Sequence, residues 1–172
     1  MITARILVAG IGNIFLGDDG FGSEVVRRAI EKLERLPLDT DSGSVRVTDY
    51  GIRGMHLAYD LLEQWDALVL VDAVPDQGSP GALHVFDADH ESLTATAGLD
   101  AHSMDPAAVF ASLQALGGDP PHTVVVGCEV ASVEDGIGLS DAVGAAVPEA
   151  VRAVESVVRM LQSEVDATVR EG

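Results

Sequence analysis

The segment that most constrains the fold is ILVAGIGNIFLGDDGFGSEVV, residues 6–26. Residues 6–9 form an apolar run without alternation, which is typical of a strand buried on both faces of a parallel sheet. A glycine-containing loop follows, and residues 22–36 then carry apolar side chains at helical spacing. The segment therefore predicts a buried strand, a glycine loop and a helix, which is the repeating unit of an α/β fold.

The rest of the chain continues this alternation. We expect further strands at 45–49, 67–73, 82–86 and 123–130, and helices at 54–65, at 105–116 and from 140 to about 161. Leu57, Leu61 and Leu62 are expected to point inward from the helix at 54–65. The fold class is predicted to be α/β, a three-layer α/β/α sandwich with a five-stranded, mostly parallel sheet.

Two local features refine this prediction. The strand at 82–86 begins about ten residues after the previous strand, which is near or below the dozen residues that a parallel crossover needs. We therefore expect this strand to run antiparallel to its neighbours. Pro148 lies inside the last helix and is predicted to kink or restart it, because proline cannot donate the backbone hydrogen bond of a helix interior.

Composition restricts the classes of partner. A chain of 172 residues, of which 47% are hydrophobic, predicts one domain over residues 1–172. The formal net charge of −18 repels nucleic acid and anionic membrane surfaces. No leader sequence or membrane-spanning run is recognisable, and the single Cys128 excludes an internal disulfide. We expect a cytoplasmic monomer that binds neither nucleic acid nor membranes.

The glycine loop is a poor match to a dinucleotide-binding fingerprint. Gly10 and Gly12 fit its first and third positions, but Phe15 stands where a third glycine is needed. Asp18 and Asp19 would lie at the helix N-terminus and repel a pyrophosphate there. A P-loop is excluded because no Gly-Lys-Ser/Thr follows. Gly10 and Gly12 are instead expected to let the chain turn tightly after the strand.

The same acidic side chains suit a cation. Asp18 and Asp19 follow the first strand, and Asp72 lies at the carboxyl end of the third, the edge at which open α/β sheets bind ligands. Two carboxylates and an imidazole would make a divalent-metal site with open coordination positions. His102 is the best candidate for the imidazole, because its loop precedes a helix and can reach this edge.

Each of these residues also has a structural alternative. Aspartates before a helix commonly cap it or interact with its dipole. Asp72 can cap the turn that follows its strand, and a histidine in a loop is commonly solvated. Spacing alone therefore leaves the metal site and the structural roles open.

Five motifs together carry a family resemblance that covers nearly the whole chain. They are ILVAGIGNIFLGDDGFGSEVV, DYGIRGMHL, LVLVDAV, DAHSMDP, and VVVGCEV followed by GIGLSDAV. This pattern resembles the nickel–iron hydrogenase maturation proteases. Members of that family are endopeptidases that trim the C-terminus of the hydrogenase large-subunit precursor.

The resemblance implies a role for five residues. The acidic ligands of the family fall on Asp19 and Asp72 and its imidazole on His102, so these three are the expected metal-binding and catalytic residues. Gly51 is expected to line the cleft where the precursor tail binds. Arg53 is expected either to contact that tail or to be an exposed structural arginine. The metal implied is nickel supplied by the precursor itself, with zinc or cadmium able to replace it in vitro.

The implied activity is removal of the precursor's C-terminal peptide after nickel insertion, with nickel as the recognition element. Asp18 is then expected to support the start of the helix or the loop. Cys128 lies within a strand pattern and is expected to be a small buried hydrophobe, and no G-x-S-x-G motif supplies a serine nucleophile. Two alternatives remain: a nickel-sensing chaperone that does not cut, and a nucleotide-binding α/β enzyme.

Overall fold

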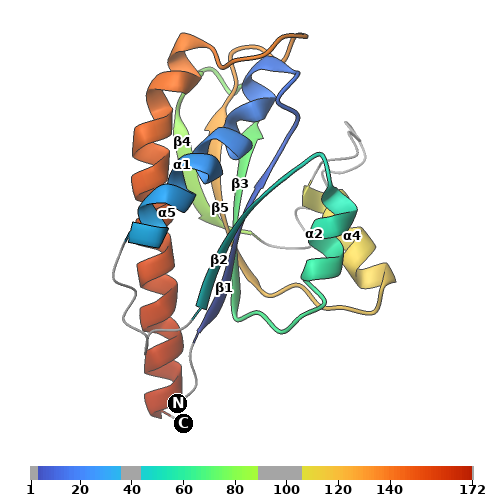
Figure 1. Cartoon of the computed structure of the whole chain (residues 1–172), viewed down its shortest axis with the longest axis vertical. Helices are drawn as coiled ribbons and strands as arrows, with labels where there is room; N and C mark the ends of the chain where they lie inside the picture. Colours follow the sequence, from blue (N-terminus) through green and yellow to red (C-terminus); the bar gives the residue numbers. More distant parts are fainter. Residues whose placement is uncertain (1–3, 36–43, 89–105, 172) are drawn as a thin grey trace.

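Five strands form a single sheet (Figure 1), and their order is β2-β1-β3-β5-β4. The computed structural model describes residues 4–35, 44–88 and 106–171. Four strands run parallel, and the fifth, β4, pairs antiparallel with β5, which confirms the orientation expected from the short connection before it. The strands are β1 (Arg5–Ile11), β2 (Ser44–Gly51), β3 (Ala67–Val74), β4 (Leu83–Asp87) and β5 (His122–Glu129).

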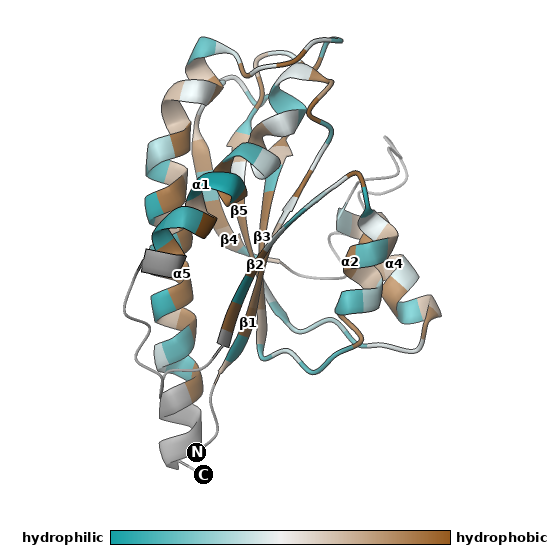
Figure 2. Cartoon of the chain, in the orientation of Figure 1, coloured by the Kyte–Doolittle hydropathy of each residue, from teal (hydrophilic) through white to brown (hydrophobic). Residues whose placement is uncertain are grey.

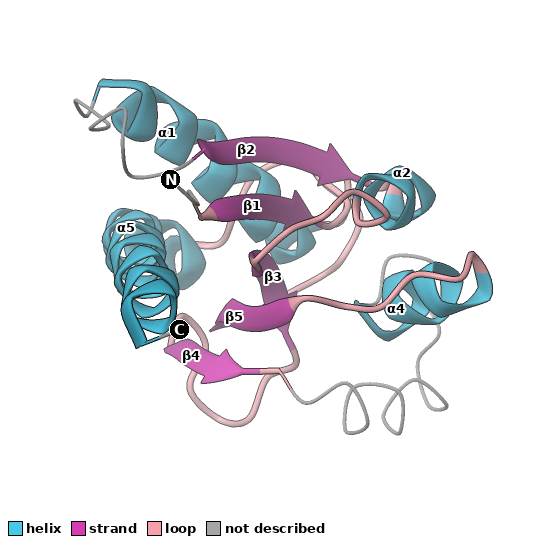
Figure 3. Ribbon diagram, turned by 90° about the horizontal axis from the view of Figure 1, so that it is seen from below, coloured by secondary structure: helices cyan, strands magenta, loops and turns pink. Residues whose placement is uncertain are grey.

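Helices cover both faces of the sheet, so the predicted three-layer α/β/α sandwich is confirmed (Figure 3). One face carries α1 (Phe21–Arg35) and α5 (Asp141–Glu171). The other carries α2 (Gly54–Asp60) and α4 (Pro106–Ala115). A short 3-10 helix, η1 (Gly17–Gly20), lies between β1 and α1.

The apolar run of β1 supplies both hydrophobic layers. Ile6 and Val8 pack against α1 and α5, whereas Leu7 and Ala9 pack against α2 and α4. Successive side chains of a strand point to opposite faces, so a strand covered on both sides needs no polar alternation. Figure 2 shows the result, with central strands that are mainly brown and helices α1 and α5 that carry both teal and brown bands.

Helix α1 approaches the sheet closely because glycines lie at the contact. A Cβ atom at Gly22 would be 2.4 Å from the carbonyl oxygens of both Ile11 and Val71. A Cβ at Gly10 would be 2.5 Å from the carbonyl oxygen of Gly22. Gly10 lies within β1, so its predicted role in a tight turn is wrong. The chain turns at Gly12, whose φ of 132° favours glycine, as predicted.

Helix α2 is shorter than predicted. It ends at Asp60 rather than near Trp65, and the Trp65 indole N–H donates to the Asp60 carbonyl at 2.9 Å after the chain has turned back. Leu57 and Leu61 are buried as expected, but Leu62 is 44% exposed, so its predicted inward position is wrong.

Helix α5 is not restarted at Pro148. It continues to Glu171, about ten residues beyond the predicted end, and Val147, Ala150 and Val151 around the proline stay buried against the sheet. Continuous apolar packing on one face therefore outweighs the hydrogen bond that proline removes. Among the described residues, no helix combines the length and apolar character that crossing a bilayer requires.

Candidate functional site

The carboxyl ends of β1 and β3 form a topological switch point. From β1 the chain passes through α1 to β2 on one side, and from β3 it continues toward β4 and β5 on the other. Open α/β sheets bind ligands at such a point, because the connections diverge and leave space between them. The predicted carboxylates Asp19 and Asp72 belong to the two segments at this point.

Asp19 lies in η1, which folds back over the end of β1 and packs against β3. A Cβ at Gly12 would be 2.0 Å from the Asp19 carbonyl oxygen, so only glycine permits this fold. The backbone N–H of Asn13 donates to Asp19 Oδ2 at 2.8 Å. Within the described part of the chain no other hydrogen bond reaches this carboxylate.

Asp72 occupies the carboxyl end of β3. It is half-buried and lies opposite Gly127 of β5. Strand alternation places it on the same face as Leu68 and Leu70, which pack in the layer of α2 and α4. Asp72 therefore belongs to the α2/α4 face of the switch point.

The third expected ligand, His102, lies outside the described residues, within 89–105. Helix α4, on the same face as Asp72, begins at Pro106, four positions after His102. Among the residues that the structure describes, no three His, Cys, Asp or Glu side chains form a group that could hold a metal ion. The metal site of Asp19, Asp72 and His102 therefore stays a prediction.

The neighbouring Asp18 has a different environment. It is fully buried, and its carboxylate accepts hydrogen bonds from the amides of Ala131, Ser132 and Ser140 and from the Ser140 hydroxyl, at 2.7 to 3.0 Å. Burial alone would raise the pKa of Asp18, but hydrogen bonds from Ser140, Ser132 and Ala131 hold it below its usual 3.8. Asp18 therefore anchors the loop before α5, in line with its expected structural role.

A cleft of about 390 Å³ opens at the carboxyl ends of β1 and β2. Both predicted substrate-binding residues, Gly51 and Arg53, line it. Gly51 has a φ of 55°, which lets the chain turn sharply out of β2. The remaining lining residues are Gly12, Asn13, Ile14, Phe15, Ser23, Asp49, Tyr50 and Ile52.

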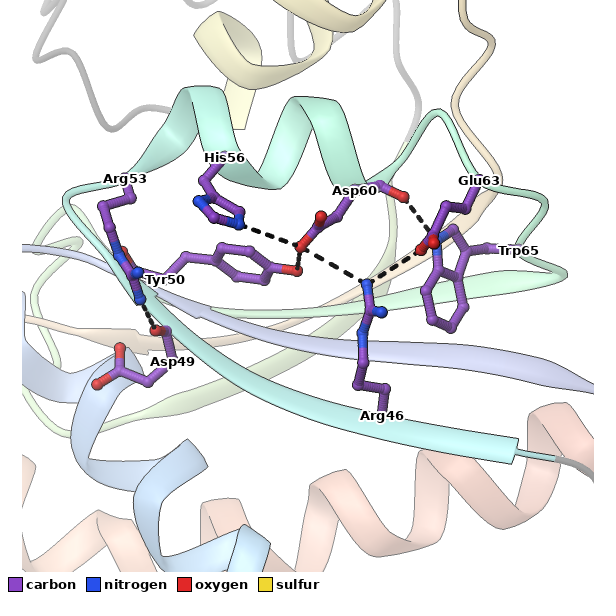
Figure 4. A network of polar contacts seen from close by, with 8 residues as sticks. All are labelled: Arg46, Asp49, Tyr50, Arg53, His56, Asp60, Glu63 and Trp65. Carbon is purple, nitrogen blue, oxygen red and sulfur yellow. Dashed lines mark hydrogen bonds and ion pairs between the residues drawn. The ribbon is translucent and has the colours of Figure 1, made fainter.

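The Arg53 side chain is oriented by backbone carbonyls (Figure 4). Its Nε donates to the carbonyl of Tyr50 at 3.3 Å, and one Nη donates to the carbonyl of Asp49 at 2.9 Å. A guanidinium has five N–H donors, so donors remain for a ligand in the cleft. The substrate-binding roles of Gly51 and Arg53 stay predictions.

Sequence reasoning assigned no role to Asp49, which also lines this cleft. Its Oδ1 accepts hydrogen bonds from the Ser23 hydroxyl at 2.7 Å and from the Gly51 amide at 3.0 Å. These contacts join α1, β2 and the turn after β2. Asp49 stands near the carboxyl end of its strand, so the rule that selected Asp72 would also have selected it.

A polar network fixes α2 to the sheet (Figure 4). The Tyr50 hydroxyl donates to Asp60 at 2.6 Å, and Arg46 lies 3.6 Å from the same carboxylate. Burial, and then the hydrogen bond to Asp60, raise the pKa of Tyr50 well above its usual 10. The guanidinium groups of Arg5 and Arg46 lie 4.6 and 4.8 Å from the Trp65 ring centroid.

Cys128 is buried in the α1/α5 layer, as predicted. Burial raises the pKa of its thiol to about 11, and the negative charges of Asp18 and Glu129 add to this effect. The thiol is therefore protonated at neutral pH and lacks the thiolate character of a nucleophile.

Comparison with known proteins identifies the family. The family model described as hydrogenase maturation protease matches residues 25–157. The chain is 32% identical over 168 residues to the hydrogenase 2 maturation protease of Escherichia coli K12, covering 97% of each chain. It is 35% identical over 132 residues to a hydrogenase expression/formation protein, HupD, of Bradyrhizobium diazoefficiens. That match covers 76% of this chain and 65% of the relative.

Solved structures agree with this assignment. The E. coli hydrogenase-maturating endopeptidase HybD superposes with a TM-score of 0.73 at 30% identity, covering 91% of this chain and 93% of that one. The nickel–iron hydrogenase maturation protease HybD from Thermococcus kodakarensis gives a TM-score of 0.67 at 25% identity, covering 90% and 99%. The chain belongs to the hydrogenase maturation protease family.

Proposed function

We propose that this protein is the endopeptidase that removes the C-terminal peptide from the large-subunit precursor of a nickel–iron hydrogenase after nickel insertion. Family membership supports the class of reaction and the class of substrate. The observation that carries the proposal is the pair of carboxylates, Asp19 and Asp72, on the two segments that meet at the switch point. In this proposal the nickel is part of the substrate, and the enzyme recognises it.

Asp19, Asp72 and His102 are the proposed nickel ligands. Oxygen and imidazole donors suit a divalent ion of this kind, and three ligands leave positions for groups of the precursor. The Asn13 amide fixes one oxygen of Asp19 and leaves the other for the metal. Helix α4 begins on the face of the sheet that carries Asp72, and only three residues separate His102 from this helix. This proximity in sequence supports the choice of His102.

The precursor tail is proposed to lie in the cleft beside this edge. Gly51 leaves room for an extended peptide, and the spare N–H donors of Arg53 can bind its carbonyl or carboxylate oxygens. A nickel ion at the edge can polarise the scissile carbonyl or lower the pKa of a water molecule. The buried, protonated thiol of Cys128 takes no part in the reaction.

Substitution of the ligands tests the site. Asp19→Asn, Asp72→Asn and His102→Ala are each expected to abolish processing while circular dichroism stays that of the wild type. The matched controls are Asp87→Asn and His122→Ala, because these two residues hydrogen-bond to each other at 2.6 Å near the amino-terminal end of β5, away from the switch point. Near-normal processing by Asp72→Asn would overturn the assignment.

A mixing experiment tests the source of the metal. Enzyme treated with a chelator and desalted is mixed with nickel-loaded or nickel-free precursor, and the size of the large subunit is followed on a gel. Full processing of the loaded precursor, and none of the nickel-free one, is expected. An enzyme that regains activity only after zinc is added would be an ordinary metalloprotease, and loaded precursor that is bound but never cut would indicate a chaperone.

A further inference from the structure

Helix α2 and its flanking turns expose a strip of apolar side chains. The apolar strip consists of Ile52, Met55, Tyr59 and Leu62, whose exposed fractions run from 44% to 62%. Met55 and Tyr59, four residues apart, lie on one side of α2. Ile52 and Leu62 belong to the turns before and after the helix. The opposite side, with Leu57 and Ala58, is buried against the sheet. A helix that buries one side normally carries polar residues on the other, so this strip needs a partner.

Charge sets the same region apart from the rest of the molecule. The chain has 28 acidic and 10 basic residues, yet residues 51–59 contain no acidic residue and include Arg53 and His56. Residues 13–17, across the cleft, contain no charged residue at all. The nearest carboxylates, Asp60 and Glu63, are paired with Arg46. An apolar surface therefore meets less repulsion here than the net charge of −18 would impose elsewhere.

The apolar strip is continuous with the proposed substrate cleft. Ile52 belongs to both, and Ile14 and Phe15, two further exposed apolar residues, line the cleft with it. A protein whose tail enters the cleft would lie over the adjacent surface. The network of Tyr50 and Asp60 fixes α2 on the sheet, so the strip is presented without a large cost of ordering.

We propose that the apolar strip docks the folded body of the hydrogenase large-subunit precursor, through an apolar segment of the precursor's surface. The inference rests on the proposed function and deepens it. Recognition then has two steps. The nickel and the tail bind at the edge of the sheet, and the surface of the precursor binds to α2. The strip then determines which precursor is bound and takes no part in cleavage.

Two substitutions in the strip test this proposal against a matched control. Met55→Glu and Tyr59→Ser are each expected to raise the KM for nickel-loaded precursor about tenfold and to leave kcat unchanged, because docking is lost while the reacting groups stay in place. Met160→Glu is the control, since Met160 is 46% exposed on α5 against 51% for Met55. Circular dichroism verifies the fold of each variant.

Binding is measured in parallel, as the Kd of the enzyme for loaded precursor. Weaker binding by both strip variants, with the control unaffected, supports the docking proposal whether or not the wild-type protein cleaves the precursor. A wild-type protein that binds the precursor but never cuts it would contradict the proposed endopeptidase function and leave the docking proposal standing. Unchanged KM and Kd for both strip variants overturn the docking proposal. So does a wild-type dimer, seen by chromatography, that Met55→Glu dissociates, because a second copy would then cover the strip.

Discussion

The two faces of the sheet are stabilised in different ways. On the α1/α5 face, two long helices of 15 and 31 residues bury a continuous apolar layer, and α1 lies on glycines close to the strands. On the α2/α4 face, the helices have only 7 and 10 residues and cover a smaller apolar layer. There α2 depends on polar contacts through Tyr50, Asp60 and Arg46.

The two faces should therefore tolerate substitution to different degrees. Apolar packing on the α1/α5 face is intolerant of change, because each side chain contacts several others in a dense layer. A short helix held by a few hydrogen bonds can change its outer surface without loss of the core. The cleft and the apolar strip both involve the α2/α4 side, so the layer with the shorter helices is also the one that we propose contacts the substrate.

The largest effect is expected from Gly22→Ala on the α1/α5 face. The new Cβ would lie 2.4 Å from two carbonyl oxygens of different strands, so α1 must move away from the sheet. We expect a loss of about 3 kcal/mol or more in the free energy of unfolding, measured by urea denaturation. Gly144→Ala in α5 is the control, because nothing lies within 4 Å of its Cβ position. It should stabilise the protein by about 0.5–1 kcal/mol.

The next effect concerns Asp18, which anchors the loop before α5. Asp18→Ala leaves three amides and a hydroxyl without their acceptor and is expected to cost about 3 kcal/mol. Asp18→Asn should be milder. It should also reduce processing far less than Asp19→Asn, since Asp18 faces the loop and not the proposed metal. A loss of processing by folded Asp18→Asn equal to that of Asp19→Asn would contradict this division.

The pH dependence of this effect follows from the direction of the pKa shift. The carboxyl group has a lower pKa in the folded than in the unfolded chain, so its contribution is fully present above the usual 3.8. It is lost as the pH falls below that value through the folded pKa. The stability difference between wild type and Asp18→Asn, measured in urea, should be constant from neutral pH downward and shrink only below about 3.8. A difference that shrinks around neutral pH would point to another group.

The sequence predicted the architecture because the relevant signals are local. The apolar run of residues 6–9, the helical spacing after Gly22 and the short connection before residue 82 depend on neighbours along the chain. The positions of Asp19 and Asp72 follow from one topological rule, that parallel strands end at a common edge.

The remaining features depend on contacts between distant residues, which no local pattern reveals. Asp18 binds Ala131 and Ser140, 113 and 122 residues away. The turn after α2 places the Trp65 ring against the guanidinium groups of Arg5 and Arg46, 60 and 19 residues away in the chain. The apolar pattern continues through Leu62 and therefore predicted a longer helix. Such a pattern contains no information about polar contacts that hold a turn.

A smaller effect is expected from Tyr50→Phe, which tests the polar attachment of α2. Loss of the hydrogen bond to the partly exposed Asp60 carboxylate should cost about 1–2 kcal/mol in urea denaturation. Tyr59→Phe in the same helix is the control, because Tyr59 is exposed and should tolerate loss of its hydroxyl. Equal stability of the two variants would show that apolar packing alone holds α2, and the contrast between the faces would fail.

The smallest effect is expected from Cys128→Ala, on the α1/α5 face. The thiol fills a small volume in the buried layer, so its loss should cost about 1 kcal/mol and leave processing at the wild-type rate. With a pKa of about 11, only roughly one thiol in a thousand is ionised at pH 8, and burial further blocks reagents. Iodoacetamide should therefore modify the folded enzyme far more slowly than it modifies free glutathione at the same pH. Rapid, stoichiometric alkylation that abolishes processing and is prevented by precursor would contradict this expectation. It would make the α1/α5 face a catalytic surface and the enzyme a cysteine protease.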